Sequence, residues 1–367
     1  MKIAIVGLGL IGGSLGMALK RKQSERPLEL IGIDIDQNIV EQAVGLKAID
    51  HGTTDLSQGV ADADIIFVAA YLSKTAELIR QILPYVKPGA IITDTGSTKT
   101  EIALQIEELL QDYPFVKYIG GHPMAGSEKS GIIAADPYLL ENAVYVLLAQ
   151  EKKNQEALET VASLVRLTGA RVLTLSAMEH DRMVASISHL PHLLSGILVN
   201  TVGSVEKDFP DVFKLAAGGF RDVTRIADSQ PELWRDIFYS NKESLQYVLG
   251  KYKEQLEKME MLLETDTKEE LLTELEQARF LRRQVPKKVK GLLPALSEIV
   301  VTIPDKPGEI GKVANILGAK DINIIDIEIL RVREGDGGTL RLGFTREEDR
   351  ERAIEVLDFF EYVSKKI

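Results

Sequence analysis

The glycine spacing near the N-terminus constrains the fold of this chain more than any other feature. An apolar run typical of a buried strand, KIAIV, leads directly into GLGLIGG, which places Gly7, Gly9 and Gly12 in GxGxxG register. The first two glycines permit a tight turn and close approach of the backbone to a diphosphate, and the third lets a helix pack on the strand. The segment predicts a dinucleotide site that also involves Leu10 and Ile11.

A carboxylate follows this motif at the expected distance. Asp34 ends the second apolar run, LELIGIDID, where a side chain can accept hydrogen bonds from the ribose hydroxyls of the nucleotide. Its charge repels a 2′-phosphate, and Ile35 and Asp36 follow it instead of Arg or Lys. The sequence therefore favours NAD over NADP.

Apolar runs alternate with amphipathic segments up to residue 176, the pattern of a doubly wound α/β sheet of the Rossmann type. The strands are expected at KIAIV, LELIGIDI, DIIFVAA, AIITDT, VKYIGG, AVYVLLA and RVLTLS.

Two further units are expected after the sheet. Strand patterns are absent from 177–290, which we interpret as an all-α domain that ends in a linker, VPKKVKGLLPA. Residues 291–367 alternate as strand, helix, strand, strand, helix, which predicts a small α+β domain. The predicted domains are thus 1–176, 177–290 and 291–367.

Composition narrows the functions that need be considered. The formal charge of −11 opposes binding to nucleic acid, and the absence of cysteine fits a reducing, cytoplasmic location. The longest uncharged segment, 183–205, includes two histidines, a proline and an asparagine, a poor composition for a lipid-facing span. We expect no membrane association and interpret the segment as a buried helix pair.

Two segments at predicted strand ends carry groups suited to acid–base chemistry. DTGSTK contains Ser97, and GGHPMAGSEKSG contains His122 and Glu128. The carboxyl ends of parallel strands meet at the ligand-binding edge of a doubly wound sheet. A neutral His122 can take a hydroxyl proton as hydride leaves the same carbon, and Ser97 can orient the other ring nitrogen.

The helical region supplies further candidates. SISHLPHLLS places His189 and His192 one helical turn apart, facing one cleft; no metal is expected, because the further ligands that zinc needs are missing. AAGGFRDVTRIADSQPELW contains Arg221, Arg225 and the only tryptophan, Trp234. Either arginine can bind a carboxylate through a bidentate contact, and their spacing does not show which of the two does so.

Taken in order, GLGLIGGS, DTGSTK, GGHPMAGSEKSG, SHLPHLL and GGFRDVTRIA resemble the prephenate and arogenate dehydrogenases of tyrosine biosynthesis over residues 1–290. The segment DKPGEIGKVANILGAKDINI resembles the ACT regulatory fold, an α+β domain of the ferredoxin-like type. The resemblance implies an NAD-dependent oxidative decarboxylation of prephenate, in a homodimer formed by the helical domain.

The resemblance also implies roles for individual residues. His122 matches the histidine that hydrogen-bonds the ring hydroxyl, and Ser97 matches the serine that positions this histidine and the nicotinamide. Arg225 matches the arginine that binds a carboxylate. The other matched positions line the substrate pocket: Glu128, His189, His192, Gly218 and Trp234.

In the ACT-like domain, backbone groups and an Asn side chain are expected to hold an amino acid, with L-tyrosine as the effector. The expected contacts are Asp305, Pro307, Gly308, Glu309 and Asn323.

Three alternatives stay open. Arogenate dehydrogenase is the closest, and His192 favours prephenate over arogenate. A 3-hydroxyacid dehydrogenase uses a lysine in its helical part, where this sequence offers histidines. The third alternative, a sensor of NAD and amino acids without activity, leaves Ser97, His122 and Arg225 together without a purpose.

Overall fold

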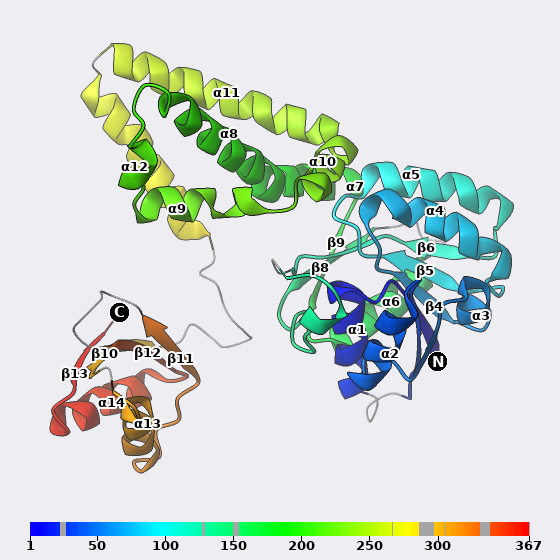
Figure 1. Cartoon of the computed structure of the whole chain (residues 1–367), viewed down its shortest axis with the longest axis horizontal. Helices are drawn as coiled ribbons and strands as arrows, with labels where there is room; N and C mark the ends of the chain where they lie inside the picture. Colours follow the sequence, from blue (N-terminus) through cyan, green and yellow to red (C-terminus); the bar gives the residue numbers. More distant parts are fainter. Residues whose placement is uncertain are drawn as a thin grey trace. The chain divides into compact units, whose positions relative to one another are not determined.

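The computed structural model describes residues 1–22, 27–126, 129–149, 154–265, 267–285, 297–304, 306–330 and 338–366. These residues form two compact units, 1–277 and 278–367. The first unit holds both the sheet domain and the helical domain, and the second contains the small α+β domain (Figure 1). The boundary predicted at residue 290 lies outside the described residues.

A parallel six-stranded sheet in the order β3-β2-β1-β4-β5-β6 forms the centre of the first unit. This order matches the doubly wound fold that the alternating pattern predicted. The chain reverses its direction of winding between β1 and β4, so the carboxyl ends of these two strands flank the ligand-binding edge. The strands are β1 (Lys2–Val6), β2 (Glu29–Ile33), β3 (His51–Thr53), β4 (Ile65–Val68), β5 (Ile91–Asp94) and β6 (Lys117–Ile119).

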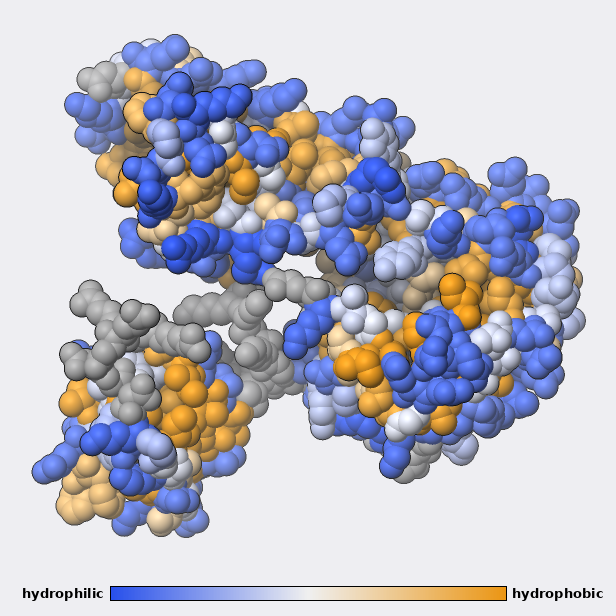
Figure 2. Space-filling model, viewed as in Figure 1, coloured by the Kyte–Doolittle hydropathy of each residue, from blue (hydrophilic) through white to orange (hydrophobic). Residues whose placement is uncertain are grey.

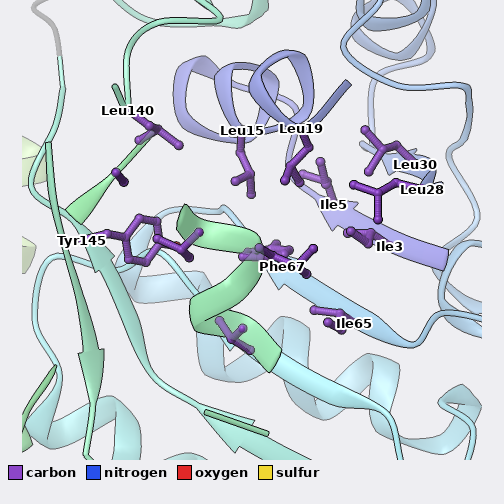
Figure 3. Close-up of a cluster of buried hydrophobic side chains, with 14 of the residues drawn as sticks. Ile3, Ile5, Leu15, Leu19, Leu28, Leu30, Ile65, Phe67, Leu140 and Tyr145 are labelled. Atoms are coloured by element: carbon purple, nitrogen blue, oxygen red, sulfur yellow. The ribbon is translucent and has the colours of Figure 1, made fainter. Parts of the chain in front are cut away.

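Helices cover both faces of this sheet, because successive side chains of each strand point to opposite faces. In β1, Ile3 and Ile5 pack with α1, α2 and α6, and Figure 3 shows them beside Leu15 and Leu19 of α1. Ala4 and Val6 point to the other face and pack with α3, α4 and α5, which cover that face (Figure 1). The helices are α1 (Leu10–Arg21), α2 (Gln37–Gly45), α3 (Leu56–Val60), α4 (Leu72–Ile82), α5 (Thr100–Leu109) and α6 (Gln155–Leu167).

The run VKYIGG, predicted as one strand, is divided between two sheets. After β6 the chain turns at Gly120 and continues as β7 (Gly121–Pro123), which joins β8 (Val144–Leu148) and β9 (Arg171–Leu175) in a second sheet. A Cβ on Gly121 would lie 2.6 Å from the carbonyl oxygen of Asp94, so only glycine fits where the strand leaves the main sheet. The single-strand prediction was wrong, and the break carries His122 into the second sheet.

The helical domain contains one long helical run instead of the predicted buried pair. Helix α7 (Ala177–Val184), a π-helical turn (Ala185–His189) and α8 (Leu190–Val205) are continuous. The remaining helices are α9 (Gly218–Thr224), α10 (Pro231–Ser240), α11 (Lys242–Glu264) and α12 (Lys268–Gln284).

Ala177–Val205 is long and apolar enough to cross a membrane by length and composition alone, which is weak evidence. Buried polar side chains tie this helix to the sheet domain: His180 contacts His122, and Asp181 accepts hydrogen bonds from the backbone of α5. Its apolar residues are largely exposed in one chain, with Ile187 at 70% and Ile197 at 47% exposure. The prediction of burial was wrong for the single chain.

The small domain forms a four-stranded antiparallel sheet in the order β11-β12-β10-β13. Its elements are β10 (Ser297–Ile303), α13 (Glu309–Gly318), β11 (Asp326–Leu330), β12 (Gly338–Phe344), α14 (Glu347–Phe359) and β13 (Val363–Lys366). The sequence pattern missed β13, whose VSKK carries one apolar residue. With it, the domain has the ferredoxin-like βαββαβ order of the expected ACT fold.

Candidate active site

Two of the three glycines in the turn after β1 have no room for a side chain. Gly7 has a φ of +92°, and a Cβ there would lie 2.5 Å from the carbonyl oxygen of Ala69. A Cβ on Gly12 would lie 2.0 Å from the carbonyl oxygen of Gly7. A Cβ on Gly9, the N-cap of α1, would meet nothing within 4 Å. The helix N-terminus, where Leu10 and Ile11 lie, is thus open to an anionic ligand.

Asp34 closes the edge of this turn. Its Oδ2 accepts a hydrogen bond from the backbone N–H of Leu8 at 2.9 Å, and its Oδ1 accepts one from Asp36 at 3.1 Å. The carboxylate is therefore held beside the glycine turn, directly after β2. This position suits contact with ribose hydroxyls and opposes a 2′-phosphate. The residues present fit an NAD dinucleotide.

A hollow of about 310 Å³ lies in the same unit. Residues from the loop after β5, from β7 and the loop after it, from the π-helical turn and from α10 surround it. It is lined by Ser97, His122, Pro123, Met124, Ala125, Gly126, Ser188, His189, Leu233, Trp234 and Ile237. The structure thus brings together four of the residues singled out in the sequence: Ser97, His122, His189 and Trp234.

His122 heads a chain of three polar side chains. Its Nδ1 lies 2.8 Å from Nε2 of His180, and Nδ1 of His180 lies 2.8 Å from Oδ1 of Asp181. Burial, together with nearby His180, Lys99 and His189, holds the pKa of His122 well below its usual 6.5. The ring is therefore neutral at neutral pH and can accept a proton.

Asp181 is buried but remains a carboxylate. Burial alone would raise its pKa, but hydrogen bonds from His180, Thr100 and Lys99 outweigh it and the pKa is lowered. The backbone N–H groups of Lys99 and Thr100 donate to its two oxygens at 2.8 and 2.7 Å, at the N-terminus of α5. The unsatisfied N–H groups at a helix N-terminus favour a negative charge.

A second buried ion pair lies beside this chain. The Lys99 side chain is fully buried and contacts Oδ2 of Asp94. Oδ1 of Asp94 accepts from the hydroxyl of Tyr118 at 2.8 Å and from the N–H of Gly121 at 3.1 Å. Burial lowers the pKa of Lys99, and the charge of Asp94 opposes that shift. The pair fixes β7, and with it His122, against the end of β5.

His189 and His192 meet Trp234 on the other side of the site. The ring of His192 stacks on Trp234 with 3.5 Å between ring centroids, and His189 meets the same ring edge-on at 6.2 Å. Nδ1 of His189 accepts from Nδ2 of Asn241 at 3.2 Å. Burial lowers the pKa of His189 to about 4 and also lowers that of His192. His192 supports the wall behind Trp234 and is not among the lining residues.

Other predicted site residues lie elsewhere. Gly218 and Arg225 are exposed and do not line the hollow. Arg221 lies in α9, and Arg225 begins the 3₁₀ turn that follows this helix. Glu128 is outside the described residues. Ser97 lines the hollow together with His122, whose Nδ1 lies 2.8 Å from Nε2 of His180. The expectation that Ser97 orients a ring nitrogen of His122 stays a prediction.

Sequence reasoning missed His180, Asp181, Lys99 and Asn241. One signal was available for the first two: SAMEHD places a His-Asp pair directly after a capping box, in which Ser176 and Glu179 cap the start of α7. Charged and polar residues in the first turns of an otherwise apolar helix need partners. Asn241 sits between two helices without a pattern of its own.

Comparison with known proteins identifies the family. Residues 15–174 match the nucleotide-binding domain of prephenate dehydrogenase, 176–277 match its dimerization domain, and 297–359 match the ACT domain. A prephenate dehydrogenase from Bacillus subtilis is 35% identical over 97% of this chain and 95% of its own length. The chain belongs to the prephenate dehydrogenase family.

Two solved structures of the family resemble most of this chain. Prephenate dehydrogenase of A. aeolicus, in complex with hydroxyphenyl propionate and NAD+, is 30% identical with a TM-score of 0.72, covering 78% of this chain and 98% of its own. Synechocystis arogenate dehydrogenase is 33% identical with a TM-score of 0.69, covering 78% of this chain and all of its own. Like its family, the chain is an NAD-dependent oxidoreductase with an appended ACT domain.

Proposed function

We propose that this chain catalyses the NAD-dependent oxidative decarboxylation of prephenate to 4-hydroxyphenylpyruvate. The observation that carries the proposal is a neutral histidine, His122, in a hollow at the carboxyl edge of a sheet whose glycine turn fits NAD. When bound, NAD accepts a hydride from C4 of the substrate ring.

The residues of the protein assist only a few steps of this reaction. His122 takes the proton of the C4 hydroxyl, so that a carbonyl forms as the hydride leaves. The bond from C1 to its carboxylate then breaks and carbon dioxide departs. The electron pair moves through the ring to the C4 oxygen, which takes back the proton held by His122, and the ring becomes an aromatic phenol. Because aromatisation drives this step, the site needs a base, carboxylate contacts and correct orientation. Ser97 and Trp234 line the hollow and suit orientation of the nicotinamide and of the substrate.

Arogenate is the second candidate substrate, favoured by the 33% identity to the Synechocystis arogenate dehydrogenase. Absorbance at 340 nm with prephenate and arogenate, each with NAD and NADP, separates the candidates. We expect prephenate with NAD to give the highest kcat/KM. If neither substrate gave NADH, only the hypothesis of a sensor without enzymatic activity would remain. Equal efficiency with NADP would remove the selective role of Asp34.

We also propose that two copies pair through the helical domain. In the described part of this domain the exposed apolar residues outnumber the buried ones, and Figure 2 shows apolar surface on its helices. Each of the three hydrophobic clusters found in the described residues lies in the sheet domain or in the ACT domain. A large exposed apolar surface is typical of an association site. We expect a homodimer whose interface covers the long apolar helix, and we expect it in the cytoplasm. Light scattering of the purified chain measures the mass of the particle and so tests the dimer.

L-Tyrosine is the proposed effector of the ACT domain. Gly308 adopts a φ of +92° at the N-cap of α13 and provides no side-chain cap, so this helix N-terminus suits a carboxylate. Pro307, Gly308 and Asn323 are exposed, and Asp305 is outside the described residues. Glu309 differs: its carboxylate already accepts from Tyr362 at 3.2 Å and contacts Lys312 at 2.6 Å. Contact between Glu309 and an effector would require these bonds to open.

A further inference from the structure

Asp181 contacts the groups that set the protonation of two histidines in the hollow. Through its side chain it binds His180, which in turn binds His122. Through its backbone carbonyl it accepts a hydrogen bond from Asn241, which in turn binds His189. Both routes start from an oxygen that can only accept a hydrogen bond, so the direction of each bond along them can be worked out.

The side-chain route determines the tautomer of His122. An ionised Asp181 accepts, so Nδ1 of His180 carries a hydrogen. A neutral His180 then has a bare Nε2, and Nδ1 of His122, 2.8 Å away, must donate to it. A neutral His122 that carries its hydrogen on Nδ1 has a bare Nε2.

The backbone route determines the tautomer of His189. The carbonyl oxygen of Asp181 accepts at 2.7 Å, so the Asn241 atom that faces it must be the amide nitrogen. This nitrogen also faces Nδ1 of His189 at 3.2 Å and can donate its second hydrogen there. Nδ1 of His189 therefore accepts. With its pKa lowered to about 4, the ring is neutral at neutral pH and carries its hydrogen on Nε2.

We infer that Asp181 fixes opposite tautomers of His122 and His189, so that the hollow receives one acceptor and one donor. Both rings line the hollow with Nδ1 already engaged, which leaves Nε2 for a bound molecule. The bare Nε2 of His122 fits a hydroxyl, and the N–H of His189 fits a carbonyl or carboxylate oxygen. Asp181, His180 and Asn241 are thus positioning residues, and this inference rests on the proposed function for its chemistry.

The buried charges also suit the arrival of one proton. Asp94 and Lys99 together are neutral wherever their shared proton lies, and Asp181 contributes one negative charge. When the hydroxyl proton reaches Nε2 of His122, the ring becomes a cation whose Nδ1 still donates to His180. The five groups are Asp94, Lys99, Asp181, His122 and His180. Their summed charge then changes from −1 to zero. The O–H bond breaks, the N–H bond forms, and the oxygen keeps the electron pair.

Nitrogen NMR of the ¹⁵N-labelled full-length chain tests this directly. The sequence contains five histidines, and single His→Asn variants assign their ring signals. In the wild type near pH 7.5 we expect a bare Nε2 in His122 and in His180, and a bare Nδ1 in His189. An Nε2–H signal from His122, which a doubly protonated His180 would produce, overturns the inference, as does an Nδ1–H signal from His189.

Two variants test the routes separately. Asp181→Asn removes the fixed acceptor, so we expect an Nε2–H signal from His122 and a kcat lower by up to roughly 10⁴-fold, the scale that a wrong histidine tautomer costs in serine proteases. KM should change much less. Asn241→Asp replaces a donor by an acceptor and should move the hydrogen of His189 to Nδ1 while Nε2 of His122 stays bare. Unchanged tautomers in both variants would overturn the inference.

Asp62→Asn is the matched control, since this carboxylate is 79% exposed and contacts Lys2. It should leave tautomers and kcat unchanged. If Asp181→Asn does not fold, the wild-type spectrum still tests the tautomers assigned to His122 and His189. Expected tautomers in a chain that does not oxidise prephenate would refute the proposed function alone. Activity with reversed tautomers would refute the role of Asp181 alone.

Discussion

The ring of His122 lies between the hollow and His180, so its removal should affect chemistry more than cofactor binding. We predict that His122→Asn lowers turnover by about 10²–10⁴-fold, the usual contribution of a positioned base, and leaves NAD affinity nearly unchanged. Turnover is followed at 340 nm and NAD binding by calorimetry. His51→Asn is the control, because this histidine is exposed and contacts Glu29. Unchanged turnover in His122→Asn would remove the ring from the mechanism.

Arg225 presents a different test, because it lies outside the lining of the hollow. If it binds a substrate carboxylate, the hollow must close on it or a second copy of the chain must supply it. We predict that Arg225→Ala mainly raises KM for prephenate, by the factor of about 10–150 that corresponds to losing a charged hydrogen bond of roughly 1.5–3 kcal/mol. Arg221→Ala should do less. The reverse order in steady-state kinetics would contradict the choice of Arg225.

Sequence reasoning found the site residues that lie in recognisable motifs. It missed the residues that hold these side chains in position. Ser97, His122, His189 and Trp234 come together in the hollow as expected. The contacts of His180 with His122, of Asp181 with Lys99 and of Asn241 with Asp181 join residues 58, 82 and 60 positions apart. No local pattern encodes such contacts, because they depend on how α7 and α11 pack against the end of the sheet.

The glycine turn and α1 act as one element, and two of its glycines should respond differently to the same substitution. A Cβ on Gly9 meets nothing within 4 Å, so Gly9→Ala should keep the urea midpoint of the wild type. The added methyl lies where the backbone approaches the pyrophosphate, so NAD affinity should fall. In Gly12→Ala the Cβ would lie 2.0 Å from the carbonyl oxygen of Gly7, so both stability and NAD affinity should fall. Wild-type NAD affinity in Gly9→Ala would contradict the assigned turn.

The π-helical turn between α7 and α8 explains why two distant histidines reach one site. In a regular α-helix, positions 180 and 189 are about half a turn apart around the axis, at 100° for each residue. One residue more in the turn leaves about 80° between them, and both are buried. Pro191 contributes, because it has no N–H to continue the α-helical bonds. The sequence pattern predicted helix here but could not reveal the extra residue.

At the scale of the whole molecule, the ACT domain should make the activity depend on tyrosine. Truncation after Lys290 removes this domain and should leave an active enzyme whose rate no longer responds to added tyrosine. For regulation the effector must bind one conformation better than another, with a typical coupling of about 1–3 kcal/mol. Rates at 340 nm with increasing tyrosine compare the two chains. Identical inhibition curves would mean competition at the active site, and the sensing role would fall.

Buried neutral histidines should also make the stability of the whole chain depend on pH. His189 is 2% exposed, and its pKa is about 4 in the folded chain against 6.5 in an unfolded one. Between these values the unfolded chain binds more protons, so the free energy of unfolding falls as the pH drops from 6.5 to 4, by on the order of 3 kcal/mol for this group. His122 acts in the same direction, whereas Asp181, whose pKa is lowered from 3.8, loses its contribution only below that value.

Urea midpoints at pH 7.5, 5.5 and 4.5 measure how steeply stability depends on pH. His189→Gln should be less stable at pH 7.5 but should lose less on acidification than the wild type does, while His51→Gln should keep the wild-type slope. Equal slopes in wild type and His189→Gln would show that His189 does not stay neutral in the folded chain, and the donor assigned to its Nε2 would then lose its basis.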